Sequence, residues 1–436
     1  MSYLIKIAWR NVLQSRSRSL LLGFSIAFVT NLMVIFLSLT GGIESKMLKS
    51  ATTLFSGDVN LAGFYKINQT SAAPMVMNYL PLLEFAKKNI PESTLIIQRV
   101  KGFGRLISDS NSVQIPMWGV NISSEKGVLD SLELAPGSKG SLMELAKTGN
   151  IVIFAEQAKK LKVKVGDSVT VSIPTFRNRN NTKDFRIAAI LKDIGILSSL
   201  SLFMNENDAR ELNQMPMDST GQIMIYLKSQ KDLKKIEERL RELLPKNGYL
   251  VMEKDPKPFW LKFERVSGEA WTGQKIDITT WQDEIAFMKW IVDVFQFLTF
   301  FVSLVLLFII VVGLMNTLWM SIKERTSEIG TMRAIGLQKN QVVKLFFLEA
   351  FLLTVISSFS GVILGVLSTL GLNRLHIPLK SEALKLFFLS DTLTFLIQSS
   401  SLFIPFCLIT FFVSLGAIYP AYKASQMKPI TAISNL

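Results

Sequence analysis

The sequence WMSIKERTSEIGTMRAIGLQKNQ, from Trp319 to Gln341, is a short polar segment between two long apolar runs. Its apolar residues recur at the spacing of a helix and fall on one side of it: Ile322, Ile329, Met332 and Ile335. Because the flanking runs are long enough to cross a membrane, we expect a short amphipathic helix across their ends. A helix in that position is a docking surface, and it predicts a chain that passes on a mechanical signal.

Two charges and two glycines shape this helix. Arg325 and Glu328 stand three residues apart and can pair on its surface, which stabilises a short helix by about 0.2–0.5 kcal/mol. Gly336 stands where a C-terminal cap would end the helix. Gly330 costs about 1 kcal/mol relative to alanine inside a helix, so its presence predicts close packing against a neighbour.

Composition and charge bound the class of protein. With 49% hydrophobic residues and a mean hydropathy of +0.34, the 436-residue chain is too apolar for a typical soluble enzyme. A few membrane spans joined to one large water-soluble domain fit these values. The formal net charge is +14, but the basic residues flank the apolar runs or alternate with acidic ones. This distribution argues against nucleic-acid binding.

The sequence lacks the patterns of an enzyme. Cys407 is the only cysteine and lies in an apolar run, and His376 is the only histidine, so no internal disulfide, cysteine metal site or Ser-His triad is expected. No Gly-Lys dipeptide occurs, so the chain has no Walker A loop. We therefore predict a non-catalytic chain with no cofactor or metal of its own.

Four apolar runs predict four transmembrane helices. Residues 1–19 hold four basic and no acidic residues and predict an amphipathic helix in the headgroup region. Residues 20–41 form the first span, and a cleaved signal peptide is the less favoured alternative because the run is long. The remaining membrane segments are a stalk with the second span at 289–320, a third span at 342–372, an outer loop or interfacial segment at 373–400, and a fourth span at 401–420.

The third span carries small residues and one acid. A small-residue face predicts close helix packing and consists of Ser357, Ser358, Ser360, Gly361 and Gly365. Glu349 lies about two turns inside the span. A carboxylate within a membrane helix is costly and therefore indicates a role for the residue. For Glu349 the sequence predicts either a structural contact or ion coupling.

Residues 42–288 hold no run long enough to span a membrane and predict a large extracytoplasmic α+β domain between the first two spans. Periodicity within it predicts strands at 150–154, 168–173, 185–191 and 222–227 and helices at 155–161 and 231–244. Pro174 to Asp184 predicts a long polar hairpin tip, either a solvated loop or a finger that binds a partner. Residues 253–281 allow no assignment.

Basic residues predict the orientation in the membrane. With four spans, the N-terminus, the 321–341 segment and the tail 421–436 fall on one side, and all three carry a net positive charge. The positive-inside rule places this side in the cytoplasm. The sequence thus predicts a multi-pass inner-membrane protein with both termini cytoplasmic and the α+β domain outside.

Three parts of the chain resemble one family of ABC transporter permeases. They are KERTSEIGTMRAIG at Lys323–Gly336 with FFLEA at Phe346–Ala350, PAYKASQMKPITAI at Pro420–Ile433, and AWRNVLQSRSRSLLL at Ala8–Leu22. Together with the order of the spans, these motifs make the whole chain similar to the family that includes FtsX, MacB and the lipoprotein-releasing LolC and LolE subunits.

The resemblance implies a dimeric permease, made of two copies or of this chain and a paralogue, that works with a separate ATPase. That cytoplasmic subunit would bind ATP and Mg²⁺ and contact the 321–341 helix, which we expect to act as the coupling helix. ATP-driven closure of the ATPase would move the stalks above the membrane without a wide channel. The family's coupling positions correspond here to Arg325, Glu328, Gly330, Arg333, Ala334 and Gly336.

In size and layout the chain further resembles the lipoprotein-releasing subunits, which extract lipoproteins from the outer leaflet of the inner membrane. Their finger recruits a periplasmic lipoprotein chaperone, and the matching residues are Phe176, Arg177 and Arg179. The face expected toward the cargo or the second permease copy holds Val305, Ile309 and Glu349. Two other functions stay open: MacB-like efflux from the periplasm, and FtsX-like regulation of cell-wall hydrolases without transport.

Overall fold

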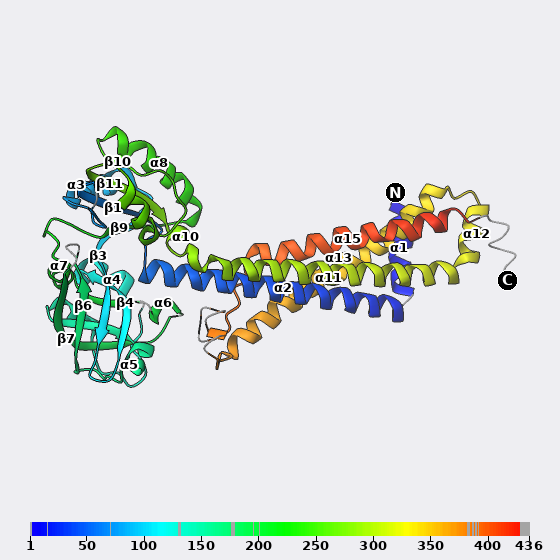
Figure 1. The fold of residues 1–436 in the computed structure, drawn as a ribbon. Coiled ribbons are helices and arrows are strands. Elements are labelled where there is room, and N and C mark those ends of the chain that lie inside the picture. Colours follow the sequence, from blue (N-terminus) through cyan, green and yellow to red (C-terminus); the bar gives the residue numbers. More distant parts are fainter. Residues whose placement is uncertain are drawn as a thin grey trace. The chain divides into compact units, whose positions relative to one another are not determined.

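The computed structural model describes residues 2–14, 16–69, 71–129, 132–175, 179–194, 196–199, 201–381, 384–385, 388, 390 and 392–427. The chain divides into two compact units, each considered by itself below. The helical unit comprises Met1–Ser45, Val292–Pro378 and Thr392–Leu436, and the α/β unit comprises Lys46–Ile291 and Leu379–Asp391. Figure 1 labels their elements along the chain.

In the described part of the chain, the helical unit is built on four helices that are long and apolar enough to cross a membrane. They are α2 (Arg16–Leu54), α11 (Ala286–Glu324), α13 (Lys339–Arg374) and α15 (Ser399–Ser425). Two shorter helices accompany them, α1 (Ser2–Gln14) and α12 (Thr326–Ala334). The arrangement agrees with the predicted membrane fold of four helices.

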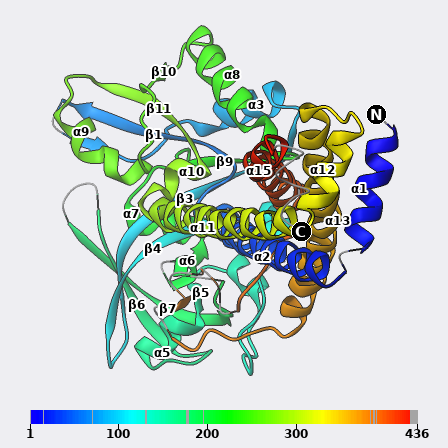
Figure 2. The same cartoon turned by 90° about the vertical axis from the view of Figure 1, so that its right-hand side faces the viewer.

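Apolar side chains from all four long helices form one buried cluster, with members such as Ile26, Leu314, Ala350 and Ile409. The helices run alongside one another in Figure 1. In Figure 2, where they are seen nearly end-on, α1 lies beside α13, and its apolar side packs there. Burial of apolar stripes therefore assembles the bundle.

Glycines on α13 let α2 approach it closely. A methyl group at Gly361 would collide with the carbonyl oxygen of Ala27, and one at Gly365 would stand 2.7 Å from the side chain of Val34. Of the five positions in the predicted small-residue face, only Ser360 is exposed. It differs because each residue turns about 100° around the helix axis, which rotates Ser360 away from its neighbour Gly361.

All four long helices extend beyond the predicted spans, and α2 and α15 do so by the most residues at their C-terminal ends. The first span was expected to end at residue 41, with the α+β domain beginning at 42, but α2 runs unbroken to Leu54. Met47 and Ala51 are buried at helical spacing before Leu54, so burial of this side sustains the helix. Helix α15 was expected to end at residue 420 and continues to Ser425, because Ala421 is fully buried in the next turn.

Among the described residues of the α/β unit, eleven strands form a sheet in the order β10-β11-β1-β9-β3-β4-β8-β5-β7-β6, and β2 pairs with β1. Their bounds are β1 (Val59–Asn68), β2 (Ser71–Ala73), β3 (Ser93–Ile107), β4 (Ser112–Val120), β5 (Asn150–Phe154), β6 (Ser168–Pro174), β7 (Asn180–Leu191), β8 (Leu202–Asn205), β9 (Gln222–Leu227), β10 (Leu250–Val251) and β11 (Gly273–Thr280).

Strand β3 connects an open sheet to a closed barrel. Up to Arg99 it pairs with β9, and from Val100 onward it pairs with β4. Strands β4, β8, β5, β7 and β6 then follow in order, and β6 pairs back onto β3, so these six strands close on themselves. Inward-facing apolar residues fill the barrel, including Leu106 and Ile115.

Helices and single turns surround these strands in the α/β unit, as Figure 1 shows. They are α3 (Tyr79–Asn89), α4 (Ile122–Leu129), η1 (Leu142–Ala146), α5 (Ala155–Leu161), α6 (Ile196–Ser199), α7 (Glu206–Asn213), η2 (Gln230–Asp232), α8 (Leu233–Lys246), η3 (Phe259–Lys262), α9 (Phe263–Gly268) and α10 (Trp281–Glu284).

Several predicted elements have the expected bounds, among them β5, α5 and β9. The hairpin tip predicted from Pro174 to Asp184 is too long. Strand β7 already begins at Asn180, which pairs with Pro174. Polar residues continue the strand because they find partners across it: the Thr170 hydroxyl donates to the Asp184 carboxylate at 2.6 Å.

Candidate functional site

Helix α12 is the short helix expected between the second and third spans, but it is shorter than the predicted range 321–341. Residues 321–324 still belong to α11, and residues 339–341 already belong to α13. Ile329 and Gly330 are buried, and Ile329 packs in a cluster with Ile322 at the end of α11. The burial of Gly330 confirms the close packing that its presence predicted. Gly336 follows the helix with a φ of +108°, a left-handed conformation that glycine adopts easily, and it ends the helix as expected.

One position on α12 contradicts the predicted apolar side. Ile335 is 83% exposed, whereas Met332 packs against the same cluster as Ile329. The Ile335 amide still donates to the Thr331 carbonyl at 3.0 Å, so the residue continues the helical turn. The reason for its exposure is that six residues of about 100° each place it about 120° around the helix axis from Ile329. Glu328 in the first turn of α12 is exposed, as are Ala334, Ile335 and Gly336 at the end of the helix and just beyond it.

Arg325 joins the start of α12 to two carboxylates. Its Nε donates to Oε2 of Glu328 at 2.9 Å, which confirms the predicted pair, and its Nη1 donates to Oε2 of Glu349 at 3.4 Å. Asn11 on α1 donates through Nδ2 to the same Glu349 oxygen at 3.4 Å. Glu349 is buried. It therefore makes a structural contact among α1, α12 and α13, one of the two roles that its position predicted.

A small cavity of about 30 Å³ adjoins Glu349, and α1, α2, α11 and α13 line it. Its polar lining comes from Glu349 and three hydroxyl groups, those of Ser19, Thr317 and Ser321. This volume suits a water molecule or two and is far too small for a lipid or a drug. Transported cargo therefore cannot occupy it.

Arg333, one of the predicted coupling residues, contacts its own helical unit. Its Nη1 donates to the carbonyl oxygens of Ser425 at 2.6 Å and of Met427 at 3.4 Å. The last carbonyls of a helix have no partner within it, and a positive charge is favourable there. Arg333 thus holds α12 against the end of α15.

Val305 and Ile309 lie on an exposed side of α11, with 38% and 58% of their surfaces accessible. Phe301 and Phe308 are exposed within a turn of them. The sequence between residues 294 and 322 contains no charged residue, and this face is largely apolar, with Asn316 as an exposed polar residue on it. Glu349, grouped with them in the prediction, instead contacts α1 and α12.

The predicted finger is described only in part. Phe176 and Arg177 lie outside the described residues. Arg179 is exposed, and its backbone closes the turn with Thr175. The Thr175 amide donates to the Arg179 carbonyl at 2.7 Å, and the Arg179 amide donates to the Thr175 hydroxyl at 3.3 Å.

A second polar site, which the sequence did not predict, lies in the α/β unit where α2 ends and α10 begins. Strands β1 and β11 pair antiparallel with Val59 opposite Thr280, and the Trp281 amide donates to the Asp58 carbonyl at 3.1 Å. The chain leaves α2 directly into β1 and enters α10 directly from β11. Both connections to membrane helices therefore start from one pair of neighbouring strands, a region we call the root.

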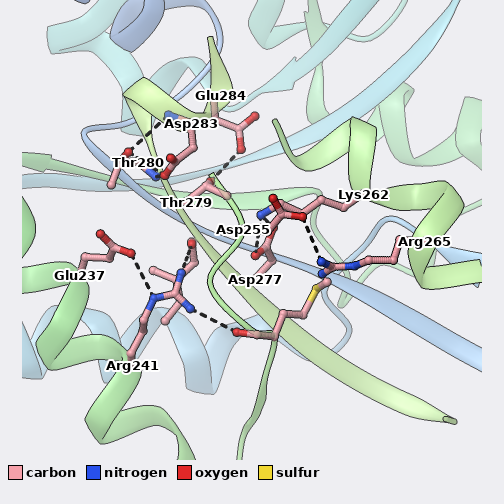
Figure 3. Close-up of polar contacts among 12 residues, drawn as sticks. Glu237, Arg241, Asp255, Lys262, Arg265, Asp277, Thr279, Thr280, Asp283 and Glu284 are labelled. Carbon is pink, nitrogen blue, oxygen red and sulfur yellow. Dashed lines mark hydrogen bonds and ion pairs between the residues drawn. The ribbon is translucent and has the colours of Figure 1, made fainter. Parts of the chain in front are cut away.

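Figure 3 shows the polar contacts around β11 in this root. The Lys262 ammonium binds both oxygens of the Asp277 carboxylate at 2.8 and 3.0 Å, and both side chains are fully buried. Burial raises the pKa of Asp277, although the ammonium beside it acts in the opposite direction. Arg241 donates to the Ile278 carbonyl at 2.7 Å and binds Glu237 at 3.1 Å.

Hydrogen bonds also fix the start of α10, as Figure 3 shows. The Thr280 amide donates to the Asp283 carboxylate at 2.8 Å while the Asp283 amide donates to the Thr280 hydroxyl at 3.4 Å, which forms a capping box. The Thr279 hydroxyl donates to Glu284 at 2.7 Å. Within the described parts of the chain, no three His, Cys, Asp or Glu residues gather to hold a metal ion. These hydrogen bonds fix the backbone where β11 passes into α10.

The chain matches two family models. The model of the MacB-like periplasmic core domain matches residues 19–243, and that of the FtsX-like permease C-terminal region matches residues 300–429. The macrolide export ATP-binding/permease protein MacB of Acinetobacter baylyi is 31% identical over 28% of this chain and 17% of its own length. The chain therefore spans less than a fifth of that relative.

Two further matches cover more of the chain. An uncharacterized ABC transporter permease of Methanocaldococcus jannaschii is 20% identical over 84% of this chain and 83% of that protein. Among solved structures, the periplasmic region of MacB from Actinobacillus actinomycetemcomitans covers 45% of this chain and 89% of its own, with 14% identity and a TM-score of 0.29.

Proposed function

The chain belongs to the MacB/FtsX family of ABC transporter permeases, and we propose that it extracts lipoproteins from the outer leaflet of the inner membrane. It is a multi-pass membrane protein with a periplasmic domain. ABC permeases of this family work with an ATPase, and in this proposal a separate subunit supplies it and binds ATP and Mg²⁺. The permease itself converts closure of that subunit into movement of α2 and α11.

The apolar face of α11 is the observation that carries the proposal. A hydrophilic substrate crossing the membrane needs a polar lining, which the uncharged stretch of α11 does not offer. Exposed apolar side chains such as Val305 and Ile309 suit the acyl chains of a lipoprotein instead, because apolar side chains and acyl chains are both favoured in an apolar environment. A second permease copy or a paralogue completes this face from the other side.

The ATPase contacts the exposed surface of α12, where Glu328 and Ile335 are accessible. We place this surface and both termini in the cytoplasm because the segments on that side carry a net positive charge. Arg325 and Arg333 transmit the movement of α12 to the membrane helices. Arg325 bonds to Glu349 of α13, and Arg333 bonds to the Ser425 carbonyl at the end of α15.

On the periplasmic side, the turn between β6 and β7 contacts a lipoprotein chaperone. Arg179 is exposed there and offers a charge for an acidic partner. Phe176 and Arg177, the other residues of the finger, belong to the same proposed contact.

Charged substitutions on α11 test the proposal. The full chain and the ATPase that co-purifies with it are reconstituted in proteoliposomes with a fluorescently labelled lipoprotein, and ATP-dependent release is measured. Val305→Asp and Ile309→Asp should lower the release rate at least about tenfold, because a carboxylate at mid-membrane depth costs about 2.5–3.5 kcal/mol against an apolar chain. The matched control is Ile363→Asp on α13, whose side chain is 47% exposed.

The control carries the same charge at a similar exposure on another helix, so it should insert, assemble and release cargo normally. Normal release by both α11 variants would contradict the proposal. Loss of release in the control as well would also count against it, because any charge in a membrane helix would then lower release through poor insertion.

Efflux is the second candidate, favoured by relatives that are named macrolide export proteins. Under this alternative, the same proteoliposomes would show ATPase activity stimulated by a macrolide and no release of lipoprotein. An FtsX-like regulator would show neither response and would instead activate a cell-wall hydrolase added to the periplasmic side.

A further inference from the structure

Arg99 occupies the one place where β3 passes from the open sheet into the barrel. Its strand neighbours pair with β9 on one side and with β4 on the other. The side chain is fully buried and forms an ion pair with Glu125 of α4, with nitrogen–oxygen distances of 2.7 and 2.8 Å. Burial by itself lowers the pKa of Arg99, but the Glu125 carboxylate beside it raises the pKa, so the guanidinium stays charged.

The same guanidinium binds the end of α2. Its Nη1 donates to the carbonyl oxygens of Thr53 and Leu54, both at 3.1 Å. These are among the last carbonyls of the helix, which have no partner within it. A charged donor satisfies them better than water or a neutral side chain does.

Strand β9 supplies the neighbouring carbonyls with donors of its own. The Tyr226 hydroxyl donates to the Thr52 carbonyl at 2.9 Å, and the Gln222 side-chain amide donates to the Phe55 carbonyl at 2.9 Å. The Phe55 ring also contacts the Trp118 ring of β4 edge to face, with centroids 5.5 Å apart. The end of α2 is therefore held by side chains from the sheet and from the barrel.

A buried ion pair is a weak source of net stability, because both charges lose their hydration. What an arginine offers here is geometry, since its planar fork can bind a carboxylate and two carbonyls at the same time. We infer that Arg99 is a positioning residue that fixes the barrel to the end of α2, so that the barrel moves whenever α2 moves. The inference rests on the proposed function, in which α2 carries a displacement outward.

The test measures whether the barrel is fixed to α2. Spin labels are placed on two exposed positions of the full chain in lipid nanodiscs, Lys49→Cys on α2 and Lys160→Cys on α5, in a Cys407→Ser background. Pulsed electron spin resonance then gives the distribution of distances between them. With Arg99 present we expect one narrow distribution.

The decisive variant is Arg99→Met combined with Glu125→Leu, which removes the pair without leaving a buried charge behind. We expect the distance distribution to widen about twofold, because the helix end loses the donors that fix it. The matched control is Lys262→Met combined with Asp277→Leu. It removes a pair that is equally buried and whose members, in the described part of the chain, bond only to each other.

A narrow distribution in the Arg99 variant would overturn the inference, and so would equal widening in the control. If the double variant fails to fold, the width of the distance distribution is measured for Arg99→Lys instead. Lysine keeps the pairing with Glu125 but lacks the fork, so widening supports the inference and an unchanged width refutes it. The measurement needs neither ATPase nor cargo, so its failure leaves the proposed function standing, and failure of lipoprotein release leaves this result unaffected.

Discussion

The ion pair of Arg325 with Glu328 and that of Arg99 with Glu125 differ in how far water reaches them. On α12, Glu328 is 61% exposed and its partner Arg325 is 23% exposed. In the α/β unit, Arg99 and Glu125 are both fully buried. An exposed pair contributes about 0–1 kcal/mol because water competes for both charges. Removing one partner of a buried pair lowers the free energy of unfolding by about 3–5 kcal/mol, because the remaining charge is left without a partner and without hydration.

This difference matches the two tasks that the proposed function gives to the chain, which are to bind the ATPase and to transmit its movement. A docking surface has to exchange its partners as the ATPase opens and closes, so weak, hydrated contacts suit it. The end of α2 has to transmit each displacement to the barrel, so buried contacts that water cannot replace suit it. In the proposed function, the exposed pair of Arg325 and Glu328 lies at the surface that binds the ATPase, and the buried pair of Arg99 and Glu125 holds the end of α2.

The largest effect is expected from breaking the buried site on one side only. Arg99→Leu should lower the free energy of unfolding by about 3–5 kcal/mol, because it leaves Glu125 buried without a partner. Denaturant unfolding of the purified chain, followed by tryptophan fluorescence, measures the loss. Arg265→Leu is the control, since its pair with Asp255 at 3.0 Å is partly exposed and should cost less than about 1 kcal/mol. Equal losses in the two variants would abolish the contrast between buried and exposed pairs.

The second prediction compares the two sides of α12. Arg333→Ala should lower the free energy of unfolding by about 1–3 kcal/mol, because the end of α15 loses a charged donor. Ile335→Asp should leave stability unchanged, since the side chain is already exposed. It should nevertheless weaken binding of the ATPase about tenfold, the equivalent of about 1.4 kcal/mol of lost apolar contact.

Thermal unfolding and affinity measurements on both variants separate these effects. Weakened ATPase binding by Arg333→Ala at full stability would mean that Arg333 faces the partner after all, as the family resemblance implied. Unchanged binding by Ile335→Asp would remove Ile335 from the docking surface.

Local patterns predicted local structure well. Strands β5 and β9 and helix α5 depend on periodicity over a few residues, and their bounds were predicted correctly. The pair of Arg325 with Glu328 was predictable for the same reason, because its partners are three residues apart. Ile335 was misplaced because it lies six residues beyond Ile329, which turns it about 120° around the helix axis from the buried side.

Pairs between distant residues were missed. Arg99 and Glu125 lie 26 residues apart, and Asn11 and Glu349 lie 338 apart, so no spacing rule connects either pair. A signal did exist for Arg99: it is a charge within the apolar strand TLIIQRV, where burial demands a partner. The sequence could have indicated that a partner exists without indicating which residue it is. Only the fold of β3 against α4 and α2 answers that question.

The smallest predicted effect concerns an ion pair of intermediate exposure. Arg239 binds Glu92 with two hydrogen bonds of 2.7 and 2.9 Å, and these bonds lower the pKa of Glu92 to about 2. Because the folded pKa lies below the unfolded value, the pair stabilises the fold fully above about pH 5. This contribution is lost as the pH falls from about 5 toward 2.

Both side chains are about a quarter exposed, so solvent screening reduces the contribution to about 1 kcal/mol. The difference in unfolding free energy between the natural chain and Glu92→Gln should therefore shrink as the pH drops through this window. Measurements at pH 7, 4 and 3 on both proteins test this. A constant difference would mean that Arg239 gains as much from a neutral amide as from the carboxylate, and the pair would then behave like the exposed contacts of α12. A difference of about 3 kcal/mol at pH 7 would instead place the pair with Arg99 and Glu125, and exposure would no longer separate the two classes.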